Sequence, residues 1–178
     1  MGRIIAAEYL TLDGVFENPA WTQPYFDEAV GAYQSEAQRW ADALLMGRVT
    51  YEGMSQAWPA MGDDPATGGD IMNSIGKYVP TSTLTEPTWN ATFLTGDLVE
   101  QVTKLTQAED KNLLVYGSGQ LSETLRAAGL IDEYRLLICP VVLGEGRRLF
   151  TGGTPSTFTV ARSRTAPSGM LLLDLVKA

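Results

Sequence analysis

Two short turns that contain glycine carry the residues best suited to binding a phosphate group. In Met46-Gly47-Arg48-Val49-Thr50, an arginine and a hydroxyl follow a glycine that ends an apolar run, and Gly117-Ser118-Gly119-Gln120 follows a second apolar run. A helix that begins at such a turn points backbone N–H groups and the positive end of its dipole outward. Each turn alone is also compatible with an ordinary strand-to-helix connection. Together, at the strand ends of one sheet, they are what a dinucleotide requires.

Two acidic residues are candidates for donating a proton in such a site. A carboxyl group that is partly buried beside a pocket has a raised pKa, which suits donation at neutral pH. Asp13 precedes Gly14 in a predicted loop, and Asp27 lies in the first turn of a predicted helix. Each has a plainer interpretation, because Asp-Gly favours tight turns and an acid in the first helical turn favours the dipole.

Aromatic residues form a further candidate group. They could build a wall for a flat heterocyclic substrate, or they could belong to the hydrophobic core, which is common for aromatic residues at helical spacing. The residues concerned are Trp21, Tyr25, Phe26 and Trp58.

The composition excludes several classes of function. The chain of 178 residues has no histidine, which removes Ser-His-Asp and Cys-His catalytic sites and zinc sites that use histidine, so we expect no metal. The net charge of −8 argues against a nucleic-acid partner. We expect no membrane partner and a cytoplasmic protein, because no signal peptide or long apolar stretch is apparent. The single cysteine, Cys139, is expected to be a buried thiol.

The apolar periodicity predicts the elements that position these residues in a single domain, residues 1–178. Short apolar runs predict buried strands, and the pattern over Tyr25–Trp40 predicts an amphipathic helix. The Pro, Gly and Asp residues of Ala57–Gly69 predict a loop. Residues 133–142 are expected to form a strand, and 157–164 with 170–176 an antiparallel hairpin. The fold class is α/β, with a mostly parallel central sheet and an antiparallel edge hairpin at the carboxyl end.

The order of several blocks resembles one known family. The chain is similar to the carboxy-terminal reductase domain of bifunctional riboflavin-biosynthesis proteins and its stand-alone relatives, within the dihydrofolate reductase-like superfamily. The resemblance covers nearly the whole chain and implies a three-layer α/β/α fold. The blocks that carry it are Thr11–Gly14, Leu45–Glu52, Lys77–Val79 with Ser82–Leu84, Val115–Gly119, Leu130–Tyr134 and Pro140–Gly146.

The resemblance implies NADPH as the cofactor and assigns residues to it. Gly47, Arg48 and Thr50 would hold the adenosine side, with Arg48 near the 2′-phosphate and Thr50 near the pyrophosphate. Ser82 and Thr83 match a segment that touches the 2′-phosphate end. The turn that would receive the pyrophosphate and the nicotinamide ribose comprises Gly117, Ser118, Gly119, Gln120 and Leu121.

The function that the resemblance implies is NADPH-dependent reduction of a small heterocyclic substrate, as in 5-amino-6-(5-phosphoribosylamino)uracil reductase. Riboflavin-pathway reductases commonly carry a glutamate before the glycine-rich turn, where it meets the substrate; here the residue is Tyr116. The alternatives are a dihydrofolate reductase proper and a non-catalytic NADP-binding sensor or scaffold. The expected partners are a small-molecule substrate and a second copy of the chain, joined through the carboxy-terminal strands as a homodimer.

Overall fold

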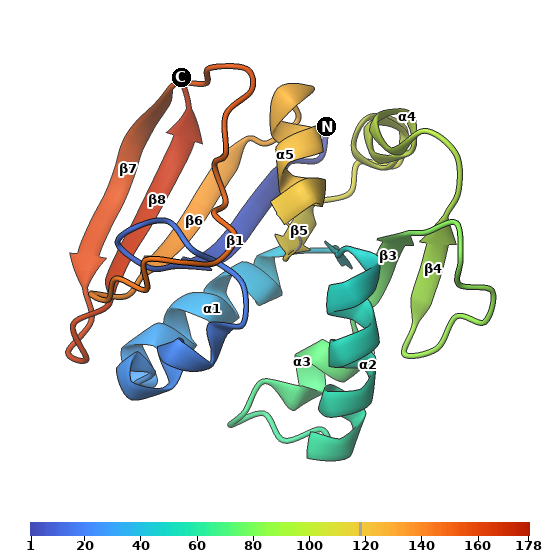
Figure 1. Cartoon of the computed structure of the whole chain (residues 1–178). Coiled ribbons are helices and arrows are strands. Elements are labelled where there is room, and N and C mark those ends of the chain that lie inside the picture. The colour runs from blue at the N-terminus through green and yellow to red at the C-terminus, as the bar shows by residue number, and fades with distance from the viewer. Residues whose placement is uncertain (118) are drawn as a thin grey trace.

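One sheet of eight strands forms the centre of the computed structural model, which describes residues 1–117 and 119–178. The strand order is β4-β3-β2-β5-β1-β6-β8-β7 (Figure 1). Neighbours from β4 to β6 are parallel, whereas β8 is antiparallel to both β6 and β7. The strands are β1 (Ile4–Leu10), β2 (Ala43–Leu45), β3 (Gly76–Pro80), β4 (Ala91–Leu94), β5 (Leu113–Tyr116), β6 (Glu133–Ile138), β7 (Phe158–Thr165) and β8 (Leu171–Lys177).

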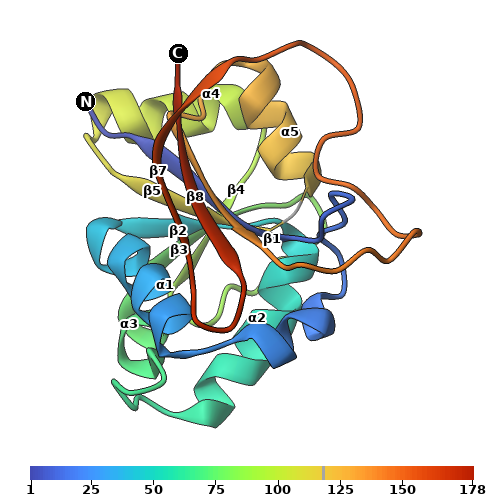
Figure 2. The ribbon, with the colours of Figure 1, turned by 90° about the vertical axis from the view of Figure 1, so that its left-hand side faces the viewer.

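Helices cover both faces of the sheet, which confirms the expected α/β/α layers. Figure 2 shows α4 and α5 above the sheet and α1, α2 and α3 below it. Among the helices of the described chain, none combines the length and apolarity needed to cross a membrane. The helices are α1 (Glu28–Trp40), α2 (Arg48–Met61), α3 (Gly69–Ser74), α4 (Leu98–Thr103) and α5 (Gly119–Ala127), with a 3-10 helix at Pro19–Tyr25 and a π-helical turn at Lys104–Ala108.

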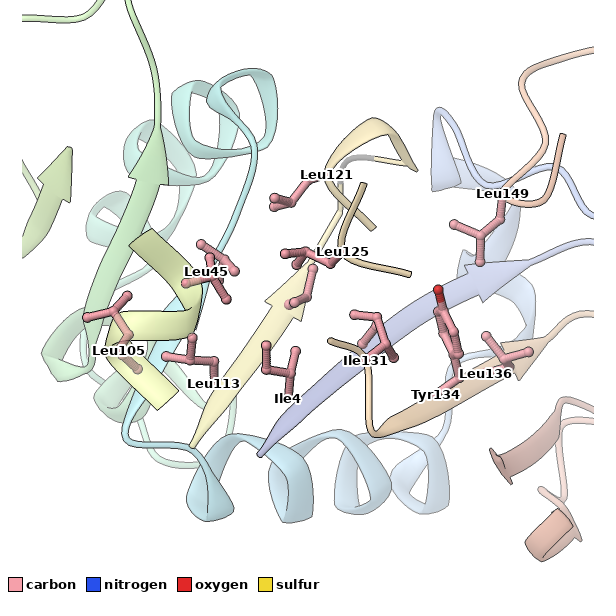
Figure 3. Packing of buried hydrophobic residues seen from close by; sticks show 14 of the residues in the cluster. Ile4, Leu45, Leu105, Leu113, Leu121, Leu125, Ile131, Tyr134, Leu136 and Leu149 are labelled. Carbon is pink, nitrogen blue, oxygen red and sulfur yellow. The ribbon is translucent and has the colours of Figure 1, made fainter. Parts of the chain in front are cut away.

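The central strands are buried on both faces because each face meets a helical layer. Successive side chains of a strand point to opposite faces. Ile4 and Ala6 therefore pack with Leu125 of α5 in an α5-side cluster, shown in Figure 3. Ile5 and Ala7 lie on the other face, in an α1-side cluster that includes helical residues from α1, α2 and α3. This arrangement explains why these strands read as short continuous apolar runs.

The first helix begins three residues later than the periodicity predicts. Asp27 is the N-cap of α1, and its carboxylate accepts a hydrogen bond from the Val30 N–H at 2.9 Å. Pro19 and Pro24 lie in the preceding 3-10 helix, and both lack the backbone N–H that a longer α-helix would need. Asp27 therefore separates the two helical segments.

The predicted loop over Ala57–Gly69 is wrong in its first part. Helix α2 continues to Met61, so the connection to α3 comprises residues 62–68. Trp58 packs against the α1-side cluster, and this burial favours another helical turn. Pro59 stands in the last turn of the helix, which ends two residues later at Met61. Tertiary packing thus overrides the local composition.

The carboxy-terminal strands form the predicted hairpin, but the strand before it is shorter than predicted. Strand β6 ends at Ile138 rather than at 142, and Pro140, which cannot donate to a strand ladder, follows soon after. Strands β7 and β8 pair from Phe158↔Lys177 to Thr165↔Leu171. Strand β7 lies at the edge of the sheet, and most of its residues are exposed.

A buried acid interrupts the apolar face of β1. Glu8 is 5% exposed, and it accepts a hydrogen bond from the Ser122 hydroxyl of α5 at 3.0 Å. Burial raises the pKa of Glu8 to about 7, because the charged form loses its hydration. The carboxyl group is therefore largely protonated below neutral pH in the folded protein.

We predict that Glu8 makes the protein less stable as the pH rises. The folded pKa lies above the unfolded value of 4.5, so its effect is absent below pH 4.5 and complete above about pH 7. Relative to Glu8→Gln, the free energy of unfolding of the wild type should fall by about 3 kcal/mol between pH 4.5 and 8, since one pKa unit corresponds to about 1.4 kcal/mol. Urea unfolding at a series of pH values measures this difference. Parallel stability curves for the two proteins would contradict it.

Candidate cofactor and substrate site

The two glycine-containing turns meet at one edge of the sheet. Strands β2 and β5 are parallel neighbours with Leu45 opposite Val115, so the turns that follow them lie side by side. Gly117 has a φ of 52°, and a Cβ atom there would lie 2.7 Å from Thr50 Oγ1. Such a separation is too short for a real Cβ contact. Glycine is therefore required where these two turns approach each other.

The first turn of α2 presents its backbone at this edge. Gly47 is the N-cap, and it has no side chain with which to bond the first turn. The first intrahelical bond runs from the Tyr51 N–H to the Gly47 carbonyl at 3.0 Å. The N–H groups of the residues between them have no acceptor within the helix, as at any helix N-terminus. This turn and Gly117 together form what we call the cradle, Gly47–Thr50 with Gly117.

Arg48 lies at the mouth of the cradle, with its side chain extended along α2. The guanidinium is 2.9 Å from the Glu52 carboxylate, and both side chains are substantially exposed. An exposed pair at this spacing contributes little stability. The guanidinium is thus free to exchange Glu52 for a phosphate group.

The residues after β3 lie next along the same edge, because β3 is the parallel neighbour of β2. The Thr81 hydroxyl accepts hydrogen bonds from the backbone N–H groups of Thr83 and Leu84, each at 3.2 Å. Ser82 and Thr83 are exposed at the tip of this turn. Ser82 and Thr83 therefore follow the strand that neighbours β2 at this edge.

The turn after β5 leads directly into α5. A Cβ at Gly119 would lie 2.5 Å from the Phe16 ring, so the ring packs against the glycine backbone. Gln120 is exposed, whereas the Leu121 side chain is buried in the α5-side cluster. Ser118, also predicted for this turn, lies outside the described residues.

Tyr116 places a phenol immediately before the cradle. Its side chain belongs to the α1-side cluster, and its buried hydroxyl makes no close hydrogen bond among the described residues, although the Gln38 side chain is near enough to lower the pKa of the phenol. Burial raises the pKa of Tyr116 to about 12, so the phenol keeps its proton. In the register of β1 and β5, Ala7 stands opposite Tyr116 and Tyr9 is its diagonal neighbour on the same face.

Asp13 does not have the raised pKa expected of a proton donor. Its carboxylate accepts hydrogen bonds from the Thr11 hydroxyl at 2.6 Å and from the Gly144 N–H at 2.9 Å. These bonds lower the pKa of Asp13 to about 2, with the Thr11 hydroxyl as the largest cause. The Arg148 guanidinium lies 3.5 Å away. The carboxylate thus connects the loop after β1 to the segment after β6.

The expectation of a raised pKa is also wrong for Asp27. One oxygen caps α1 through Val30, and the other accepts a hydrogen bond from the Ser168 N–H at 2.8 Å. The Val30 bond is the main cause of a lowered pKa. The plainer interpretation of Asp27, a residue that favours the start of a helix, agrees with this geometry.

The aromatic candidates do not gather into one wall. Trp21 and Tyr25 pack against a third cluster, which is formed by α1, β6, β8 and the turn before β8. Trp58 packs against the α1-side cluster. Phe26 is 54% exposed and lies against Gly31. The core interpretation therefore holds for Trp21, Tyr25 and Trp58 but not for Phe26.

Two segments distant in the sequence are joined beside the cradle. Residues 11–17 after β1 and 141–149 after β6 form what we call the loop pair. Backbone hydrogen bonds run from Leu12 to Val141 at 2.8 Å and from Leu149 to Gly14 at 3.0 Å, and Val15 forms a bridge with Arg148. A Cβ at Gly146 would lie 2.7 Å from Val15, so this glycine permits the contact.

Phe16, Arg147 and Arg148 lie at the site, although no sequence pattern of their own indicates them. Each reaches the edge of the site through contacts between the two segments of the loop pair. Their sequence signal is the adjacent block with Gly144 and Gly146. Glu8 was also missed, although a charge inside the apolar run of β1 marks it.

The chain is similar to known proteins over nearly its whole length. The family model described as the RibD C-terminal domain matches residues 3–172. The uncharacterised protein YyaP of Bacillus subtilis strain 168 is 35% identical over 153 residues, which cover 83% of this chain and 80% of that protein. A putative riboflavin biosynthesis protein from Shewanella sp. PV-4 superposes with a TM-score of 0.81 and 22% identity, covering 99% of each chain.

A further solved structure shares the fold over part of its length. It is a diaminohydroxyphosphoribosylaminopyrimidine deaminase/5-amino-6-(5-phosphoribosylamino)uracil reductase from Thermotoga maritima. Its TM-score is 0.72 at 14% identity, over 99% of this chain and 57% of that one. These structural likenesses establish the fold.

We predict that Gly117→Ala destabilises the protein by about 1–3 kcal/mol, because the backbone is left-handed and the added methyl group meets Thr50. A double-mutant cycle with Thr50→Ala separates these two causes. The loss should be smaller in the Thr50→Ala background, because the steric part is then relieved. Thermal or urea unfolding of the four proteins provides the measurement. Equal losses in both backgrounds would show that Thr50 does not constrain Gly117.

Proposed function

Because the chain belongs to the RibD C-terminal domain family, we propose that it is an NADPH-dependent reductase of a small heterocyclic or carbonyl substrate. The observation that carries the proposal is the cradle. Gly117 approaches Thr50 so closely that no Cβ fits between them, and the uncapped first turn of α2 begins at the same place. This backbone arrangement suits the diphosphate of a dinucleotide.

The residues around the cradle fit NADPH in their chemistry. Thr50 would supply a hydroxyl to the diphosphate, and Gly119 with Gln120 would supply the start of α5. Arg48, Ser82 and Thr83 are exposed at neighbouring strand ends and can receive the 2′-phosphate. When bound, NADPH supplies a hydride. The chain's contribution is to orient the cofactor and the substrate and to limit the access of water.

The substrate is proposed to meet Tyr116 at the end of β5. Its phenol retains its proton and makes no close hydrogen bond among the described residues, with Gln38 nearby, so it can donate a hydrogen bond to a substrate oxygen or nitrogen. A dihydrofolate reductase proper would need a carboxylate free to bind the pterin. Both oxygens of Asp27 are engaged with backbone N–H groups, which speaks against that alternative.

We further propose that two copies of the chain associate through the carboxy-terminal strands. Strand β7 is an edge strand, and Val160 on it is 56% exposed. Unpaired edges with exposed apolar residues favour association. Sedimentation of the wild type should give about twice the monomer mass, and Val160→Asp should shift the species toward the monomer. A wild-type monomer at micromolar concentration would contradict this proposal.

We predict that Arg48→Ala weakens NADPH binding about tenfold or more and changes NADH binding less than about threefold. A hydrogen bond to a charged group contributes about 1.5–3 kcal/mol, and NADH lacks the 2′-phosphate. Fluorescence titration with each cofactor measures both effects. Arg39→Ala, an exposed arginine on α1, controls for the change in net charge. Equal weakening of both cofactors would refute the 2′-phosphate role of Arg48.

A further inference from the structure

A hollow of about 450 Å³ lies beside the first half of α5, next to the cradle. Its other wall is the segment 146–151, and Phe16 also lines it. We call it the arginine hollow. Its size falls within the range of small-molecule sites. The side chains with hydrogen-bond donors in its lining are Gln120, Thr124, Arg147, Arg148 and Thr151.

Arg147 is oriented by contacts that leave most of its donors unused. Its Nε donates to Glu17 Oε2 at 2.7 Å, and its backbone N–H donates to Glu17 Oε1 at 2.9 Å. The guanidinium lies 5.6 Å from the centre of the Phe16 ring. No residue in the described part of the chain accepts a hydrogen bond from its terminal nitrogens. The guanidinium is thus held at one edge and available at the other.

Arg148 is held in the same way, and its partner Asp13 also lies in the segment 11–17 of the loop pair. Its Nε donates to the Asp13 carbonyl at 2.9 Å, and Nη2 lies 3.5 Å from the Asp13 carboxylate. Its Nη1 has no partner within the residues described here. Two consecutive arginines are therefore positioned through Nε while terminal N–H groups stay free.

The acidic groups around the hollow are already paired. Glu123 lines the hollow, and its carboxylate lies 2.5 Å from the Arg126 guanidinium. The hydrogen bond from Arg126 is the main cause of the lowered pKa of Glu123, and the charge of the guanidinium adds to it. Hydrogen bonds from Arg147 lower the pKa of Glu17 in the same manner. The free N–H groups of Arg147 and Arg148 consequently face no unpaired carboxylate from these residues. In a chain of net charge −8, such local positive groups are what an anionic ligand needs.

We propose that the arginine hollow binds a phosphate group through the terminal nitrogens of Arg147 and Arg148. The planar guanidinium matches the tetrahedral anion with two parallel donors. The Thr151 hydroxyl adds a neutral donor at the wall, whereas the Thr124 hydroxyl already donates to the Gln120 carbonyl at 2.9 Å. The inference rests on the proposed function solely for the carrier of the phosphate: the cradle accounts for the diphosphate of the cofactor, so the carrier is a second, phosphorylated ligand.

Calorimetric titration with inorganic phosphate at constant ionic strength tests the proposal on the full chain. The wild type should bind phosphate, and Arg147→Ala and Arg148→Ala should each weaken binding about tenfold. Arg147 is largely exposed, so its variant is expected to fold even where Arg148→Ala does not. Arg39→Ala has the same net charge as each variant and should bind like the wild type.

Repeating the titration with saturating NADP⁺ identifies the carrier. Phosphate that still binds with the same affinity assigns the hollow to a second, phosphorylated ligand, whereas competition by NADP⁺ would contradict that assignment. Arginine-dependent phosphate binding by a protein that binds no NADP⁺ would retain this inference and remove the proposed function. The inference fails if the wild type binds no phosphate, or if Arg39→Ala weakens binding as much as Arg147→Ala.

Discussion

Parallel pairing of β2, β5 and β1 is the constraint on which the site depends. It brings the carboxyl ends of three strands to one edge, so the turns that follow them lie together although the sequence separates them widely. The contact of Gly117 with Thr50 fixes the distance between two of these turns. Any side chain larger than hydrogen at Gly117 would separate them. The helices on both faces in turn hold the strands in this register.

Electrostatic pairing organises the outer part of the site. Asp13, Asp27 and Glu17 all have a lowered pKa, because backbone and side-chain donors surround each carboxylate. Their role is to join segments: Asp13 and Glu17 hold the loop pair, and Asp27 joins α1 to the turn before β8. The buried acid with a raised pKa is Glu8, on the opposite face of the sheet from Tyr116.

The sequence was sufficient to predict the mostly parallel sheet, the edge hairpin and the meeting of the two glycine turns, because these follow from periodicity and from the direction of parallel strands. The three layers were implied by the family resemblance. The sequence was insufficient to predict the role of Asp13 and Asp27 and the direction in which their pKa values shift. Whether Asp13 donates a proton or ties a loop depends on Gly144, which is distant in the sequence. The continuation of α2 past Ala57 likewise depends on the burial of Trp58, which local composition does not reveal. Arg147 and Arg148 acquire their orientation from the same kind of distant contact.

The central claim is that the cradle holds NADPH. Titration of the wild-type protein with NADPH and with NADH, followed by nicotinamide fluorescence, tests it most directly. We predict saturable binding of NADPH, and we expect NADH to bind at least about tenfold more weakly because it lacks the 2′-phosphate. If neither nucleotide binds, the fold is present without its cofactor, and the reductase proposal is contradicted.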